Sequence, residues 1–88
     1  MIGTPIQKED IVNYKIVPAA EDHTKELMTK LFSAQRLGNE FKGKTRIVFQ
    51  TEDGPKIVET TVWSLTENYL QIKGGVLIPL KALLEIDY

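Results

Sequence analysis

Few side chains in this sequence suit acid–base or metal chemistry, and the single histidine lies alone. His23 follows Glu21 and Asp22 at the start of a predicted helix, where it could serve as a general base or a metal ligand. A metal centre would need further nitrogen or sulfur ligands, and the sequence has no cysteine and no second histidine. We therefore interpret His23 as a solvated residue of the first helical turn. The sequence predicts no catalytic residue, no metal site and no cofactor.

Acidic pairs and a glycine pair are the other arrangements that could carry chemistry. The acids at 52–53 and 85–87 fall in a predicted turn and a terminal strand, and we interpret them as solvated charges. The pair Gly74-Gly75 could cradle a phosphate if it opened a helix. It joins two predicted strands instead, which favours a two-residue hairpin turn. We therefore expect that this protein is not an enzyme.

Aromatic and cationic side chains on the outward side of the predicted strands form the one candidate interaction patch. If Val62 belongs to the core, the alternation of a strand turns Trp63 outward. Exposed aromatic rings with cationic neighbours suit a protein-binding hot spot or single-stranded nucleic acid. The alternative is that the helix or the segment 11–17 covers Trp63 and makes it part of the core. The patch consists of Arg46, Trp63, Tyr69 and Lys73.

The first half of the chain predicts one helix, at residues 21–37. Its start has Asp22 as a plausible cap, and its end has Gly38-Asn39 as a stop signal. Residues 1–10 are predicted to be a loose tail, and residues 11–17 could form a short strand that Pro18 ends. Apolar residues recur at helical spacing and predict one buried stripe. The stripe consists of Leu27, Met28, Leu31, Phe32 and Leu37.

The second half predicts strands with short connections. The expected strands cover residues 45–51, 56–65, 69–73, 76–79 and 83–87. Consecutive strands without crossover helices must pair antiparallel. Five short twisted strands around one small core tend to curl into a partly open barrel. The expected fold class is therefore α+β: an N-terminal helix followed by a five-stranded antiparallel meander, curled into an SH3-like small barrel over residues 43–88.

Parts of this pattern resemble the Sm-like RNA-binding family. The run from Phe41 to Phe49, followed by Asp53-Gly54, resembles the family's opening strands, and Ile72-Lys73-Gly74 resembles the basic-glycine step of its second motif. The Asp-x-x-Met-Asn element is absent, and Gly75 stands where the family has an acid or Asn. Two strand-like segments also follow the basic-glycine step, where the family has one. The resemblance therefore implies an architecture, and it transfers no base-binding role to any residue.

Length and charge limit the remaining function classes. Eighty-eight residues suit a single domain, 1–88, and eleven basic residues against twelve acidic ones leave a net charge of −1. This balance gives no whole-chain footprint for a polyanion. The absence of cysteine favours a reducing cytoplasm, and residues 1–6 do not form a signal peptide. No apolar run approaches the length of a membrane span.

These observations predict a small intracellular, non-catalytic interaction module in the cytoplasm. Its expected partner is another protein or a second copy of itself, and no membrane or small-molecule substrate is indicated. The alternative is a small barrel that binds single-stranded RNA or DNA through Arg46, Trp63, Tyr69 and Lys73. Ionic strength separates the two, because binding to nucleic acid weakens steeply with salt.

Overall fold

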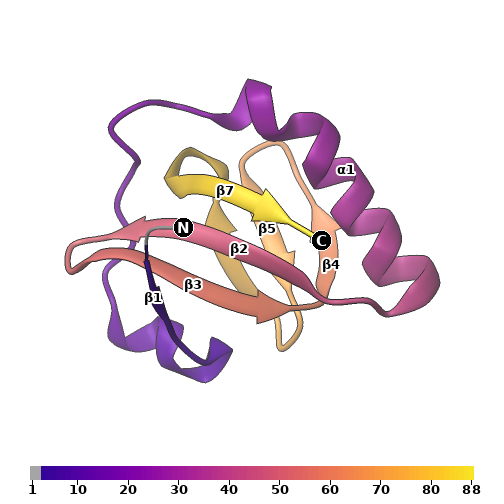
Figure 1. Cartoon of the computed structure of the whole chain (residues 1–88), viewed down its shortest axis with the longest axis horizontal. Helices are drawn as coiled ribbons and strands as arrows, with labels where there is room; N and C mark the ends of the chain where they lie inside the picture. The colour runs from indigo at the N-terminus through magenta and orange to yellow at the C-terminus, as the bar shows by residue number, and fades with distance from the viewer. Residues whose placement is uncertain (1–2) are drawn as a thin grey trace.

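Two small sheets and one long helix form the chain in the computed structural model, which describes residues 3–88 (Figure 1). The four-stranded sheet has the order β1 (Thr4–Pro5), β3 (Gly54–Thr60), β2 (Thr45–Thr51) and β7 (Leu83–Asp87). The three-stranded sheet has the order β4 (Val62–Leu65), β5 (Tyr69–Ile72) and β6 (Val76–Pro79). The helical elements are η1 (Lys8–Asn13), α1 (Thr24–Phe41) and η2 (Leu80–Ala82).

The predicted SH3-like barrel of five strands is wrong, because residues 3–88 form seven strands in two sheets and neither sheet closes. The reason lies in the predicted strand 56–65, which is interrupted at Thr61. Before Thr61 the chain pairs with β2, and after it the chain pairs with β5 in the other sheet. The α+β class and the strands at 45–51, 76–79 and 83–87 are confirmed.

The N-terminal segment is more ordered than the sequence predicts. The described part of the predicted tail 1–10 contains β1, which runs parallel to β3, and the beginning of η1; residues 1–2 lie outside the described residues. The predicted strand 11–17 is also wrong, since η1 extends to Asn13 and a single bridge joins Ile16 to Thr51. Ile11 is buried, so the short helix packs one apolar side chain against the core.

Helix α1 runs four residues beyond its predicted end because Gly38 does not stop it. Gly38 is buried inside the helix, and a Cβ at this position would overlap the carbonyl oxygen of Val62. The missing side chain therefore lets the helix approach β4 closely. The helix ends at Phe41, and the next residue, Lys42, caps it with a left-handed φ of 53°. The Gly43 N–H donates a hydrogen bond to the Leu37 carbonyl at 3.2 Å.

The buried face of α1 also differs from the predicted stripe. Phe32 is 58% exposed, whereas Ala34 is fully buried. Small residues face the sheets where the helix comes closest, so the large Phe32 lies outside the contact. The buried helix residues are Leu27, Leu31, Ala34 and Gly38. Within residues 3–88, no helix is both long enough and apolar enough to cross a membrane.

The core fills the space between the inner faces of the sheets and the helix. Figure 1 shows the four-stranded sheet in front, the three-stranded sheet behind it and α1 along one side. The side chains with no exposed surface come from both sheets and from α1, so the two sheets depend on one shared core. They include Leu31, Ile47, Phe49, Val62, Leu70, Ile72, Ile78, Leu83 and Ile86.

The close approach at Gly38 generates a stability prediction. Gly38→Ala should destabilise the fold by about 1–3 kcal/mol, because the added methyl group must push α1 away from the Val62 backbone. The exposed neighbour Asn39 provides the control, and Asn39→Ala should leave stability nearly unchanged. Urea unfolding of both variants measures the difference. Equal midpoints for Gly38→Ala and the unsubstituted protein would show that the contact does not hold the helix.

The β5–β6 hairpin generates a second prediction. Gly74 and Gly75 have φ values of 93° and 84°, which L-residues rarely adopt. Replacing either glycine with Val should cost roughly 1–2 kcal/mol. Lys73→Val is the control, because Lys73 lies in the same hairpin without a left-handed φ. Thermal unfolding compares the two single glycine variants with Lys73→Val. Glycine variants as stable as Lys73→Val would contradict the assigned turn.

Candidate interaction surface

Strand β5 separates a core side from a solvent side by strict alternation. Leu70 and Ile72 are fully buried, whereas Tyr69 is 43% exposed and Lys73, just past the strand, is exposed. Gln71 lies between them and is half-buried. Because neighbouring residues of a strand point to opposite faces, Tyr69, Gln71 and Lys73 share the side of the sheet that faces away from the core.

Trp63 occupies a bulge in β4 on that same side. Val62 pairs with Ile72 and Ser64 pairs with Gln71, so Trp63 is an extra residue between two registered pairs. Val62 is fully buried, and Trp63 is 47% exposed. The Ser64 hydroxyl donates a hydrogen bond to Gln71 Oε1 at 3.0 Å, which fixes the direction of the bulge. Trp63 therefore points outward as predicted, but the alternation breaks at the bulge, because Ser64 pairs with Gln71 on the same side. Neither the helix nor the segment 11–17 covers Trp63 completely.

Strand β6 adds an apolar residue that the sequence analysis missed. Leu77 pairs with Gln71 and is 48% exposed, and Pro79 pairs with Tyr69. The alternation around the buried Ile78 would have placed Leu77 outward, but only the pairing shows that it lies beside Gln71. We call the solvent side of this sheet the outer face. It consists of Trp63, Ser64, Tyr69, Gln71, Lys73, Leu77 and Pro79.

The structure brings three of the four predicted patch residues to one sheet and places Arg46 on the other. Arg46 lies in β2, where its Cα pairs with those of Glu59 and Asp87. Its guanidinium lies 3.7 Å from a Glu59 carboxylate oxygen. Arg46 therefore lies beside acidic residues on the four-stranded sheet and is not part of the outer face. The cation of the outer face is Lys73.

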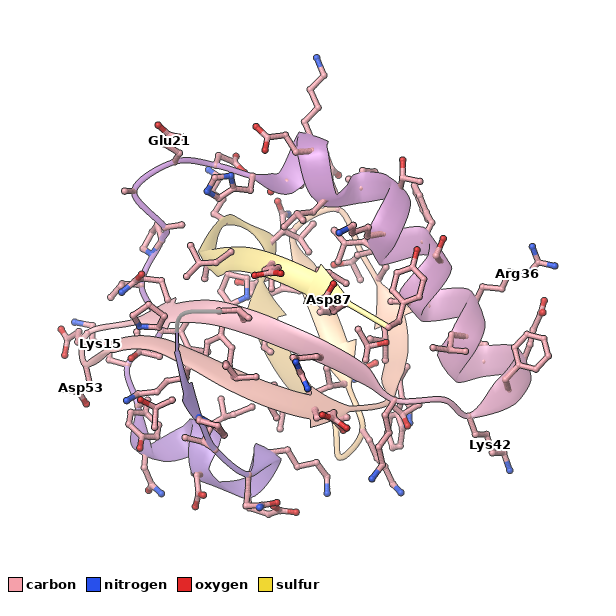
Figure 2. The ribbon with its side chains drawn as sticks, viewed as in Figure 1. Lys15, Glu21, Arg36, Lys42, Asp53 and Asp87 are labelled. Carbon is pink, nitrogen blue, oxygen red and sulfur yellow. The ribbon has the colours of Figure 1, made fainter. Side chains whose placement is uncertain are left out.

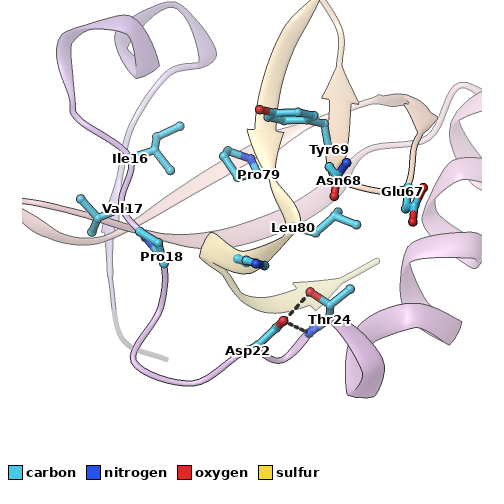
Figure 3. A pocket seen from close by; sticks show the side chains of 11 residues that line it. Ile16, Val17, Pro18, Asp22, Thr24, Glu67, Asn68, Tyr69, Pro79 and Leu80 are labelled. Carbon is cyan, nitrogen blue, oxygen red and sulfur yellow. Dashed lines mark hydrogen bonds between the residues drawn. The ribbon is translucent and has the colours of Figure 1, made fainter.

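A cleft of about 350 Å³ adjoins the outer face at Tyr69 and Pro79 (Figure 3). The opposite wall is the segment before α1, with Ile16 and Pro18. Figure 3 shows the Tyr69 ring and Pro79 on one side and Ile16 and Pro18 across from them. The charged residues at the cleft are Asp22, Glu67 and Lys81. Apolar walls with a few charged groups at the margin are typical of a binding cleft.

Asp22 holds the start of α1 against this cleft. Its carboxylate accepts hydrogen bonds from the Thr24 side-chain hydroxyl and from the Thr24 backbone N–H at 2.9 Å. The hydrogen bond from the Thr24 hydroxyl, followed by that from the backbone N–H, lowers the pKa of Asp22 below its ordinary value. The sequence prediction of Asp22 as the helix cap is wrong in position, because the N-cap residue is His23, which makes no side-chain cap hydrogen bond, and Asp22 lies one residue before it. The Asp22 carboxylate still accepts a hydrogen bond from the backbone N–H of Thr24, the first residue of α1.

The residues considered for catalysis lie apart from the outer face. His23 Nδ1 is 3.5 Å from a Glu26 carboxylate oxygen, one turn along α1. Asp53 and Asp87 project from different ends of the four-stranded sheet (Figure 2). Across residues 3–88, no three His, Asp or Glu side chains gather in a way that could hold a metal ion. In the same view, Arg36 and Lys42 extend from the helix, so charge is dispersed around the molecule.

The comparisons with known proteins add no family to this description. No family model, no curated protein and no solved structure matches the chain. Function is therefore inferred from the described residues alone.

The hydrogen bonds from Thr24 to Asp22 lead to a pH prediction. A lowered pKa in the folded state stabilises the fold at neutral pH, and this stabilisation is lost as the pH falls through the lowered value. In an NMR titration, Asp22 should titrate below an unperturbed aspartate, and Thr24→Ala should raise its pKa. Thr29→Ala, at an exposed position of the same helix, should not. An Asp22 pKa unaffected by Thr24→Ala would contradict the assigned hydrogen bond.

Proposed function

We propose that this protein is a small, non-catalytic interaction module that binds an extended segment of another protein across the outer face. The observation that carries the proposal is the exposure of Trp63, Tyr69 and Leu77, by 47%, 43% and 48%, on one side of one small sheet. Clustered exposed apolar side chains mark interaction sites, and aromatic residues dominate the energy of such sites.

The size of the outer face supports a segment as the partner. Its strands have four residues each, so the face measures about 13 Å along the strands and about 10 Å across them. A stable interface between globular proteins buries roughly 800 Å² on each partner. The face is too small for that by itself, but it suits a few residues of an extended chain that continues into the cleft beside Tyr69.

The edge of the three-stranded sheet favours a segment that lies across the outer face over one that pairs with β6 as an additional strand. Strand β6 forms one edge, and Pro79 has no N–H to offer at its end. Proline on an edge discourages pairing with a further strand. A segment that crosses the face uses side chains for its contacts and does not depend on this edge.

Charge gives the segment a direction. Lys73 lies at the Trp63 end of the outer face, and Glu67 lies at the cleft, close to Tyr69. A complementary segment carries an acidic group at the Lys73 end, apolar residues in its middle and a basic group at the cleft end. Nucleic acid is less suited to this surface, because Arg46 belongs to the other sheet and a basic groove along a strand is lacking on the outer face.

Selection from a displayed library of random peptides tests the proposal. Peptides that bind the folded protein should contain apolar residues and lose binding to the Trp63→Ala and Leu77→Ser variants. Phe41→Ser is the matched control, because Phe41 is 70% exposed on α1, away from the outer face, and its loss should leave binding intact. Trp63→Ala should cost about 1–2 kcal/mol of stability, less than the roughly 3–5 kcal/mol of a fully buried aromatic residue.

Four results would contradict the proposal. Selected peptides could bind the Trp63→Ala and Leu77→Ser variants as well as the original protein, or no peptide could be selected. Sedimentation could show a dimer that only these two substitutions dissociate, which would make a second copy the partner. Finally, a single-stranded oligonucleotide could bind with a steep salt dependence, which would favour nucleic acid.

A further inference from the structure

Lysines from three distant parts of the chain converge where it passes from one sheet to the other. Thr60 pairs with Thr45, so the next step along the ladder sets Lys44 opposite Thr61. From the other sheet, the Lys73 backbone N–H donates to the Thr61 carbonyl at 2.9 Å. Thr61 therefore lies between Lys44 and Lys73, although these lysines are far apart in sequence.

Lys8 reaches the same place from the N-terminal segment. Its Cε would lie 3.8 Å from a Cβ built on Gly74, so its side chain lies along the β5–β6 turn. In Figure 1 that turn and the connection between β3 and β4 lie together at the lower centre. The three lysines border a cavity of about 190 Å³, together with Gln7 and Thr61. This volume is several times the roughly 30 Å³ that one water molecule occupies in the liquid.

The acids of the cavity already face cations. Glu9 accepts a hydrogen bond from Lys8 Nζ at 2.8 Å, and Glu59 lies 3.7 Å from the Arg46 guanidinium. Lys44 and Lys73 form no ion pair with any residue from 3 to 88. The cavity is therefore bordered by two lysines that form no ion pair with a carboxylate of residues 3–88. The Thr61 hydroxyl and the Gln7 amide are further polar groups of its lining.

We propose that this cavity binds one phosphate-sized oxyanion, held chiefly by the ammonium groups of Lys44 and Lys73. A lysine ammonium is a compact charge with three donors, which suits the oxygens of a phosphoryl group. Lys8 adds positive charge while it remains bonded to Glu9. The anion is either free phosphate or the phosphoryl group of a modified residue. The site shares Lys73 with the outer face but needs none of its apolar residues, so binding of phosphate and binding of a peptide segment can fail separately.

The single tryptophan of the chain reports on binding, since Trp63 lies two residues after Thr61. Addition of millimolar phosphate should change its fluorescence to saturation, while chloride at equal ionic strength should not. Amide resonances of Thr61 and Gly74 should shift in the same titration. A serine peptide compared with its phosphoserine form shows whether a phosphorylated chain binds more tightly than the free ion. A single-stranded oligonucleotide that alone binds, with a steep salt dependence, would replace the proposal with a nucleic-acid site.

The matched variants carry the same charge change at different places. Lys44→Gln with Lys73→Gln should weaken phosphate binding by at least about tenfold, because charge-assisted hydrogen bonds are lost. Lys25→Gln with Lys30→Gln, on the exposed side of α1, should bind as the original protein does. Thermal melts check that both are folded. If both double variants lost phosphate binding equally, the effect would come from the net charge of the protein and the site would be wrong. The absence of fluorescence and amide changes with phosphate would also overturn the site.

Discussion

The contact between Gly38 of α1 and the Val62 backbone is the constraint on which the remaining arrangement depends. It brings α1 against β4 at the residue where the second sheet begins. Because interiors are packed to crystal-like density, an approach this close requires the absence of a side chain. The helix can then cover the side of the core between the two sheets, with Leu31 and Ala34 fully buried.

One consequence is that the outer face of the three-stranded sheet stays uncovered. The described part of the chain has a single long helix, and that helix packs on the core beside β4 and β7. The N-terminal segment instead places β1 against β3 of the other sheet. No further element of residues 3–88 is left to shield Trp63 and Leu77, so their exposure follows from the architecture and from the small size of the chain.

The passage between the sheets at Thr61 also explains why unlike surfaces lie side by side. Strands from both sheets end there, and each contributes the lysine at its end, Lys44 or Lys73. Directly beyond it, the bulge in β4 turns Trp63 outward. A cationic cavity therefore adjoins an apolar face, and a ligand with a negative group next to apolar residues would find both at once.

The sequence by itself determined three of the strands and the alternation of side chains within a strand, although it missed β1 and joined β3 to β4. Periodicity two marked 45–51, 76–79 and 83–87, and the pair Gly74-Gly75 marked a turn that needs positive φ. Alternation also separated Val62 from Trp63 correctly. These features are local, because they depend on the geometry of one strand or one turn.

Only the tertiary structure decided which strand pairs with which. Local alternation orients a side chain relative to its own strand, but the partner strand depends on contacts between residues far apart in sequence. Thus Arg46 and Trp63 both point outward, yet they lie on different sheets, because the chain changes partners at Thr61. Likewise, Gly38 resembles a helix stop in the sequence but lies inside α1. Glycine is needed there because the β4 backbone leaves no room for a side chain.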